Sequence, residues 1–162
     1  MIKRAEANDP VAMNQIGKYC SDEGDYEKAF EYYTKAAGLG NPLAHHNLSI
    51  MYRLGRGFEI DEKKEMYHLE EAAIGGHAEA RFNLGYVVGK SGRYDKAIRH
   101  YIIAANQGHD GSLDNLKKSY ADGYVAKDDF ASALRGHKAA VDATKSPQRE
   151  LAEAAKQRAR QK

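Results

Sequence analysis

The sequence contains a single cysteine, no tryptophan and only three prolines among its 162 residues. Because Cys20 has no second cysteine to pair with, disulfide-stapled secreted scaffolds and cysteine-rich zinc modules are excluded. Long hydrophobic runs are also missing: the apolar stretches are only a few residues long, whereas a membrane-spanning helix needs roughly 20. We therefore expect neither a membrane span nor a fold that depends on disulfides or structural zinc.

An excess of charge of one sign is lacking as well. The 25 Lys and Arg residues nearly balance the 23 Asp and Glu residues, which gives a formal net charge of +2. A protein that binds nucleic acid by electrostatics would carry a basic face, so we do not expect a nucleic-acid partner. The first six residues contain no apolar stretch like that of a secretory signal, and we expect a cytoplasmic protein.

The composition favours helices. The chain is rich in alanine, and each proline follows a small polar residue, in the pairs Asp9-Pro10, Asn41-Pro42 and Ser146-Pro147. A helix accepts proline readily only in its first turn, where the backbone N–H has no partner within the helix. The three prolines therefore predict helix starts, and the sequence as a whole predicts an all-α fold.

Two short blocks of sequence recur in alternation along the chain. The first block occupies residues 12–17, 44–49, 80–85 and 112–117, with spacings of 32, 36 and 32 residues. The second is marked by Ala29, Glu65, Ala97 and Ala133, with spacings of 36, 32 and 36. Each unit thus predicts two helices joined by a turn, and tandem units of this length stack into a superhelix with one continuous core.

Small residues stand where the two helices of a unit should cross: Gly17 and Gly85 in the first helix, and Ala29, Ala97 and Ala133 in the second. The large side chains expected to fill the core are Ile16, Leu48, Leu84, Leu116, Phe30, Met66, Ile98, Leu134, Tyr33, Leu69, Tyr101 and His137. Three positions depart from the pattern, because Ser49 and Lys117 replace the glycine and Glu65 replaces the alanine.

These units resemble the Sel-one-like repeats of the tetratricopeptide-repeat superfamily. The resemblance is carried by Asn83-Leu84-Gly85, by residues 24–29 (Gly-Asp-Tyr-Glu-Lys-Ala) with Tyr32-Tyr33, and by residues 52–57 (Tyr-Arg-Leu-Gly-Arg-Gly) with residues 61–64 (Asp-Glu-Lys-Lys). It implies a right-handed α-solenoid of four helix-turn-helix repeats and a C-terminal capping helix.

The expected boundaries follow from the repeat. Residues 1–8 should be the end of a preceding helix or an N-terminal cap, and residues 9–145 should form the repeats, at about 9–40, 41–76, 77–108 and 109–145. Residues 146–162 should form a basic capping helix. From Lys145 onward the chain carries six basic and two acidic residues, which fits either a solvated cap or a contact with nucleic acid or another anionic surface.

Proteins similar to these repeats serve as adaptors, so the resemblance implies a non-enzymatic scaffold that holds a peptide or a partner helix in its concave groove. The family's ligand-contacting positions lie on the first helix of each repeat, and here they correspond to Asn14, Lys18, His46, Ile50, Arg53, Phe82, Tyr86, Asp114 and Lys118. Ile50, Phe82 and Tyr86 with Arg53 nearby have the composition of a binding hot spot. Alternatively, Phe82 and Tyr86 fill the gap between neighbouring first helices.

Signs of catalysis are sparse. A Gly-rich phosphate loop is missing, and the seven histidines include no pair four residues apart on one helix face. We expect no enzyme activity, no cofactor, no bound metal and no small-molecule substrate. The alternative is a hydrolase like the secreted, Cys-rich relatives linked to β-lactam hydrolysis, but those need paired cysteines and an export signal.

Overall fold

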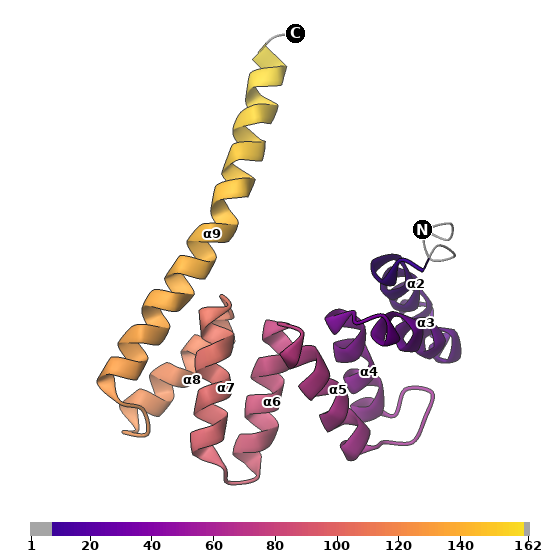
Figure 1. Ribbon diagram of the computed structural model, residues 1–162, viewed down its shortest axis with the longest axis horizontal. Helices are drawn as coiled ribbons and strands as arrows, with labels where there is room; N and C mark the ends of the chain where they lie inside the picture. The colour runs from indigo at the N-terminus through magenta and orange to yellow at the C-terminus, as the bar shows by residue number, and fades with distance from the viewer. Residues whose placement is uncertain (1–7, 161–162) are drawn as a thin grey trace.

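The computed structural model describes the backbone of residues 8–160 and the side chains of residues 8–145, 151 and 152. The regular elements in this part of the chain are all helices: α2 (Pro10–Asp22), α3 (Tyr26–Gly38), α4 (Pro42–Leu54), α5 (Glu62–Ile74), α6 (Ala78–Lys90), α7 (Tyr94–Asn106), α8 (Asp110–Ala121) and α9 (Lys127–Arg160). Successive helices pack side by side in an arc, with α2 and α3 at one end and α9 projecting from the other (Figure 1). The predicted all-α solenoid of paired helices is confirmed.

Polar residues fix the starts of the first helices of the repeats. Asp9 accepts a hydrogen bond from the backbone N–H of Val11 at 2.9 Å, and Asn41 accepts one from Ala44 at 2.9 Å. A proline follows each of these caps, so the helix starts predicted at Asp9-Pro10 and Asn41-Pro42 are confirmed. Further along the chain, histidines take the capping role. Nδ1 of His77 accepts a hydrogen bond from the backbone N–H of Ala80 at the start of α6, and Nδ1 of His109 accepts one from Ser112 at the start of α8.

Replacing Asn41 with alanine should lower the free energy of unfolding by about 1–2 kcal/mol. The change removes the cap of α4 and also the hydrogen bond that the Asn41 amide donates to the Pro10 carbonyl of the preceding repeat, at 3.3 Å. Urea melts measure the loss. Asn41→Asp keeps the cap acceptor and loses only the donor, so it should fall between the wild type and Asn41→Ala. An aspartate variant no more stable than the alanine variant would refute the capping role.

The C-terminal part differs from the expected organisation. α9 runs without a break from Lys127 to Arg160, so the second helix of the fourth repeat and the cap expected at residues 146–162 are one helix. The helix start predicted at Ser146-Pro147 is wrong. A proline inside a helix costs about 3 kcal/mol, but the Ala, Glu, Gln and Leu residues that follow it are strong helix formers that favour continuation. The end of a preceding helix, expected at residues 1–8, lies outside the described residues apart from Asn8.

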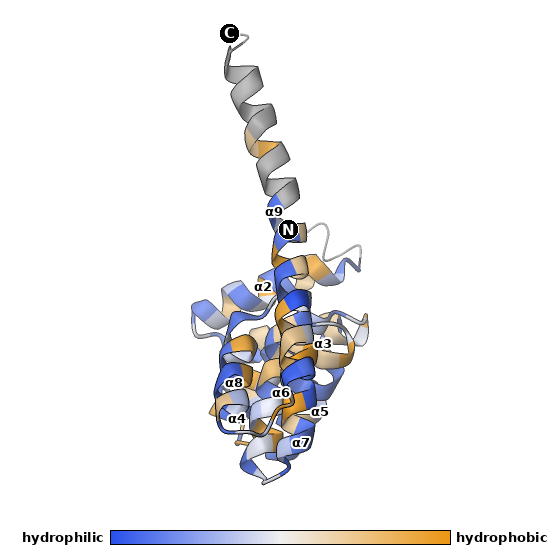
Figure 2. Ribbon diagram, turned by 90° about the vertical axis from the view of Figure 1, so that its left-hand side faces the viewer, coloured by the Kyte–Doolittle hydropathy of each residue, from blue (hydrophilic) through white to orange (hydrophobic). Residues whose placement is uncertain are grey.

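The helices carry both hydrophobic and hydrophilic residues (Figure 2), and the core between the paired helices is built mainly of alanine and leucine. The small residues Ala29, Ala97 and Ala133 are buried, as are the large residues Leu48, Leu84, Leu116, Tyr33, Leu69 and Tyr101. Ile16, Phe30, Met66 and Ile98 are partly buried against them. Leu134 was expected in the core but is 38% exposed. The reason is its place in α9, because no further repeat covers this helix within the described residues.

Where the two helices of a repeat cross, the size of the residue in the first helix depends on the side chain that faces it from the second helix. A Cβ atom added to Gly17 would lie 2.7 Å from the ring of Tyr33, and one added to Gly85 would lie 2.9 Å from the ring of Tyr101. Both contacts are too short, so a tyrosine in the second helix requires glycine in the first. In the second repeat Leu69 takes the place of the tyrosine. The smaller side chain leaves room for Ser49, which explains this departure from the pattern.

Candidate partner-binding groove

A groove of about 790 Å³ lies between α4 and α5 of the second repeat and α6 of the third. Its apolar side chains are Ile50, Met66, Leu69, Tyr86 and Val87. Its charged side chains are Arg53, Lys63, Lys90, Glu62 and Glu65, and the polar residues Ser49, Asn83 and Ser91 complete the lining. An apolar surface with charged groups around it is suited to bind a polypeptide segment that has both apolar and polar side chains.

The groove forms where the repeat departs from its own pattern. In the first and third repeats, glycine and alanine occupy the helix crossing as Gly17 with Ala29 and Gly85 with Ala97. In the second repeat the corresponding residues are Ser49 and Glu65, and both line the groove. The second repeat thus carries two larger polar side chains at positions where the first and third repeats carry small residues. Glu65 is therefore a site residue that the repeat pattern singled out as irregular, although it was not predicted to contact a ligand.

The groove carries three basic and two acidic side chains, and its basic groups are not held in close ion pairs within the described part of the chain. Arg53, Lys63 and Lys90 form no ion pair with another side chain that the structure describes. The Lys90 ammonium lies 5.6 Å from the centre of the Tyr86 ring, within the range of a cation–π contact. Burial raises the pKa of the half-buried Glu65, and the positive charge of Arg53 opposes this rise. The groove thus places cations without a close ion pair to a described side chain beside an apolar surface.

Three of the nine predicted site residues come together in this groove. Ile50 and Arg53 reach it from α4, and Tyr86 reaches it from α6. Tyr86 is 53% exposed, which favours a binding surface over gap filling at this position. The two helices belong to different repeats, so the groove exists only because neighbouring repeats stack.

Three other predicted residues hold the repeats together instead. Asn14 on α2 accepts a hydrogen bond from the Asn47 amide on α4 at 2.9 Å. Nε2 of His46 lies 3.3 Å from the amide nitrogen of Asn83 on α6. Phe82 packs in the core, with its ring centre 5.7 Å from that of Tyr101 and 4.7 Å from that of His109. For Phe82, gap filling between first helices is therefore the better interpretation.

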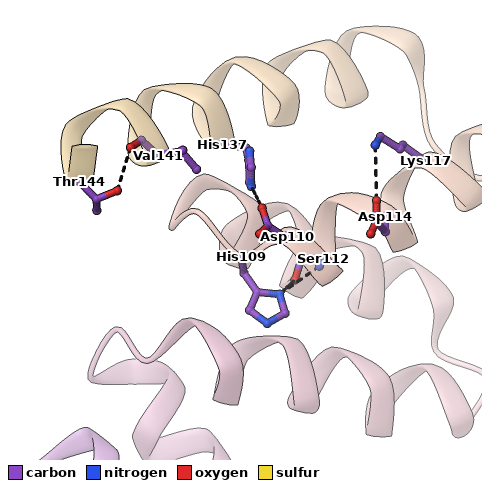
Figure 3. Close-up of polar contacts among 8 residues, drawn as sticks. All are labelled: His109, Asp110, Ser112, Asp114, Lys117, His137, Val141 and Thr144. Carbon is purple, nitrogen blue, oxygen red and sulfur yellow. Dashed lines mark hydrogen bonds and ion pairs between the residues drawn. The ribbon is translucent and has the colours of Figure 1, made fainter. Parts of the chain in front are cut away.

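The remaining three predicted residues, Lys18, Asp114 and Lys118, are exposed and do not line the groove. Lys18 forms an ion pair with Asp22 at 2.8 Å on α2. Asp114 forms one with Lys117 at 3.4 Å on α8 (Figure 3). Both are exposed pairs within a single helix, which contribute little to stability.

The histidines make contacts between helices. His109 caps α8 and its Nε2 lies 2.8 Å from the Glu79 carboxylate of α6, while His137 of α9 lies 2.8 Å from the Asp110 carboxylate of α8 (Figure 3). Among the described residues, no three His, Cys, Asp or Glu side chains are placed to hold a metal ion, and no helix is long and apolar enough to cross a membrane. The basic side chains of the C-terminal segment beyond Lys145 lie outside the described ones.

Comparisons with known proteins agree with this architecture. A model of the Sel1 repeat matches residues 10–41, 42–77 and 78–109. The crystal structure of a Sel1 repeat protein from Oxalobacter formigenes superposes with a TM-score of 0.69 at 31% sequence identity, over 86% of this chain and 60% of that one.

Two curated proteins share part of the sequence. An uncharacterized protein of Neisseria meningitidis serogroup B is 28% identical over 139 residues, which cover 85% of this chain and 30% of that protein. Chitin synthase regulatory factor 4 of Schizosaccharomyces pombe is 32% identical over 107 residues, which cover 65% of this chain and 17% of that protein. The chain thus spans less than a third of the length of either curated relative.

Proposed function

This chain belongs to the Sel1 repeat family, and we propose that it is a non-enzymatic, cytoplasmic scaffold that binds a segment of a partner protein in the groove between α4, α5 and α6. Repeat proteins of stacked helix pairs often mediate protein interactions through extended surfaces. The relative from Schizosaccharomyces pombe is by its name a regulatory factor of an enzyme, which is compatible with action through another protein.

The observation that carries the proposal is the meeting of Ile50, Arg53 and Tyr86 in one groove. Exposed aromatic and arginine side chains next to aliphatic ones are typical of residues that dominate binding energy at protein interfaces. Tyr86 offers a large apolar surface with a hydroxyl, and Arg53 offers a planar cation that the described side chains leave unpaired. The three side chains require no rearrangement of the core, because none of them belongs to its buried clusters.

The two serine hydroxyl groups of the groove are held by the backbone, which argues against a nucleophilic role for either. Ser49 Oγ donates a hydrogen bond to the His46 carbonyl at 2.7 Å, and Ser91 Oγ donates one to the Val88 carbonyl at 2.7 Å. Each serine is thus bonded to the backbone three residues earlier. A nucleophilic serine needs a neighbouring base that accepts its proton, and a backbone carbonyl cannot do this.

The test uses peptides selected for binding. A library of random peptides displayed on phage is panned against the immobilised full chain, and a fluorescein-labelled copy of the most frequent peptide is titrated by fluorescence anisotropy. Arg53→Ala combined with Tyr86→Ala should weaken binding at least about tenfold, because both side chains that provide contact energy are removed. Circular dichroism should show an unchanged helical fold, since both residues lie outside the core.

A matched control is the pair Tyr19→Ala and Arg135→Ala. These residues are of the same types and are exposed, but they lie on α2 and α9 and do not line the groove. The control should bind the peptide as the wild type does. Equal binding by the groove variant and the wild type would mean that the partner surface lies elsewhere on the solenoid.

A further inference from the structure

A second hollow, of about 330 Å³, adjoins the groove between α6, α7 and α8. Four tyrosines line it, and we call it the tyrosine pocket: Tyr86, Tyr94, Tyr101 and Tyr124. Tyr101 is buried, whereas Tyr94 is 63% and Tyr124 69% exposed. The rings of Tyr94 and Tyr124 are inclined by only 23°, with their centres 6.3 Å apart. Exposed aromatic rings gathered around a hollow form a surface for apolar, ring-shaped groups.

The tyrosine pocket adjoins the groove, because Tyr86 and Lys90 line both, and a ligand that crosses these two residues contacts both hollows along one path. Tyr94 in turn lines both the tyrosine pocket and a third hollow of about 390 Å³, whose charged residues are Arg93, Asp95, Lys96 and Arg99. A single ligand that contacts all three hollows must be long and narrow, as an extended peptide is.

The charge along this path is predominantly positive. The basic residues that line the three hollows are Arg53, Lys63, Lys90, Arg93, Lys96 and Arg99, and the acidic residues are Glu62, Glu65 and Asp95. None of the basic residues forms an ion pair with another described side chain. The whole chain is nearly neutral, so this excess is local, and it is complementary to an acidic partner.

Tyrosine-lined pockets bind two kinds of ligand, and the positive charge of the path favours one of them. Aromatic rings bind quaternary ammonium groups by cation–π attraction, and they bind proline by packing against its ring. Here the Lys90 ammonium already lies 5.6 Å from the centre of the Tyr86 ring, and it would repel a second cation. Proline is neutral, and a proline-rich segment is extended before it binds, which reduces the entropy lost on binding.

We propose that the partner segment is extended, contains proline, which packs against Tyr94 and Tyr124, and carries acidic residues, which face the lysines and arginines along the path. The proposal rests on the proposed function, because it assumes a polypeptide in the neighbouring groove. It assigns the class of partner that the groove alone leaves open: an acidic, proline-containing extended segment rather than a helix.

Panning the random peptide library against the full chain tests this composition. The selected peptides should be enriched in proline with aspartate or glutamate nearby. For a fluorescein-labelled copy of the most frequent peptide, replacement of its prolines by alanine should weaken binding about tenfold. Replacement of its acidic residues by the corresponding amides should weaken binding and reduce its dependence on salt. A copy with trimethyllysine in place of proline should bind more weakly than the original.

Variants of the chain test the pocket. Tyr94→Ala combined with Tyr124→Ala should weaken binding of the labelled peptide about tenfold or more. Tyr94→Phe with Tyr124→Phe keeps the rings and should stay within about threefold of the wild type. The control pair, Tyr19→Ala with Tyr67→Ala, removes two tyrosines of similar exposure that line none of the three hollows, and it should bind as the wild type does.

The outcomes separate this inference from the proposed function. Peptides that depend on Arg53 and Tyr86 but lack proline, or that bind the Tyr94→Ala/Tyr124→Ala variant normally, would overturn the inference and leave the proposed function intact. If the trimethyllysine copy bound more tightly than the original peptide, the group that the pocket binds would be a cation and not proline. Failure to select any peptide would contradict the inference and the proposed function together.

Discussion

Replacement of Leu48 with alanine should lower the free energy of unfolding by about 2–5 kcal/mol. Leu48 on α4 is only 1% exposed and belongs to the buried cluster that joins the first repeat to the second. Truncation removes its apolar contacts and leaves a cavity, because helices held by their neighbours on both sides relax only partly. Urea unfolding followed by circular dichroism measures the loss.

Leu43 provides the matched control, since it lies on the same helix but is 43% exposed. Leu43→Ala should cost less than about 1 kcal/mol, because most of its surface already faces water. If the two substitutions were equally costly, the burial pattern assigned to α4 would be incorrect, and with it the register of the second repeat.

The chain should lose about 2–4 kcal/mol of stability between pH 7.5 and pH 5, after allowance for the partial exposure of His68. Burial lowers the pKa of His46 to about 4, and the neighbouring His77 adds to the effect. Burial also lowers the pKa of His68 to about 4, and the neighbouring His45 lowers it further. In the unfolded chain both should titrate near 6.5. Above that pH they are neutral in both states, whereas below it only the unfolded chain takes up the protons.

The contribution of these two histidines to the free energy of unfolding is therefore fully present above pH 6.5 and is lost as the pH falls toward 4. Burial also lowers the pKa of His77, whose Nδ1 caps α6 and cannot accept a hydrogen bond once protonated. The paired variant His46→Gln with His68→Gln should show a smaller loss between the two pH values, whatever its stability at neutral pH. Unchanged stability at pH 5, or an increase, would contradict the burial of neutral imidazoles.

The sequence predicted the fold well because its repeat constrains many residues at once. Leu84, Tyr101 and Ala97 recur in register with their counterparts in other repeats, and a periodic core follows from their spacing. The prediction failed at Pro147, where a local rule about proline conflicted with the helix-forming residues around it. It also failed at Leu134, because burial of the last helix depends on what stacks next to it and not on its own residues.

The candidate site was harder to predict, because residues on the same helix face can contact either a neighbouring repeat or a ligand. Tyr86 and Phe82 are four residues apart on α6, yet the first lines the groove while the second packs against Tyr101 and His109. The distinction depends on side-chain packing between repeats, which the sequence does not specify. Glu65 was visible as a departure from the repeat, and it does line the groove. Tyr94 recurs in register with Tyr26, whereas Tyr124 lies in the turn between α8 and α9 and has arginine, Arg56, as its counterpart in the second repeat, so the repeat pattern does not single out the two rings as a pair.

A crystal structure of the full chain with the peptide selected by panning would show directly where a partner segment binds. We expect the peptide to lie along the groove between α4, α5 and α6, in contact with Ile50, Arg53 and Tyr86, and to continue over Lys90 into the tyrosine pocket. A peptide bound to the surface of α3 or α9 instead, with the groove unoccupied, would contradict this expectation.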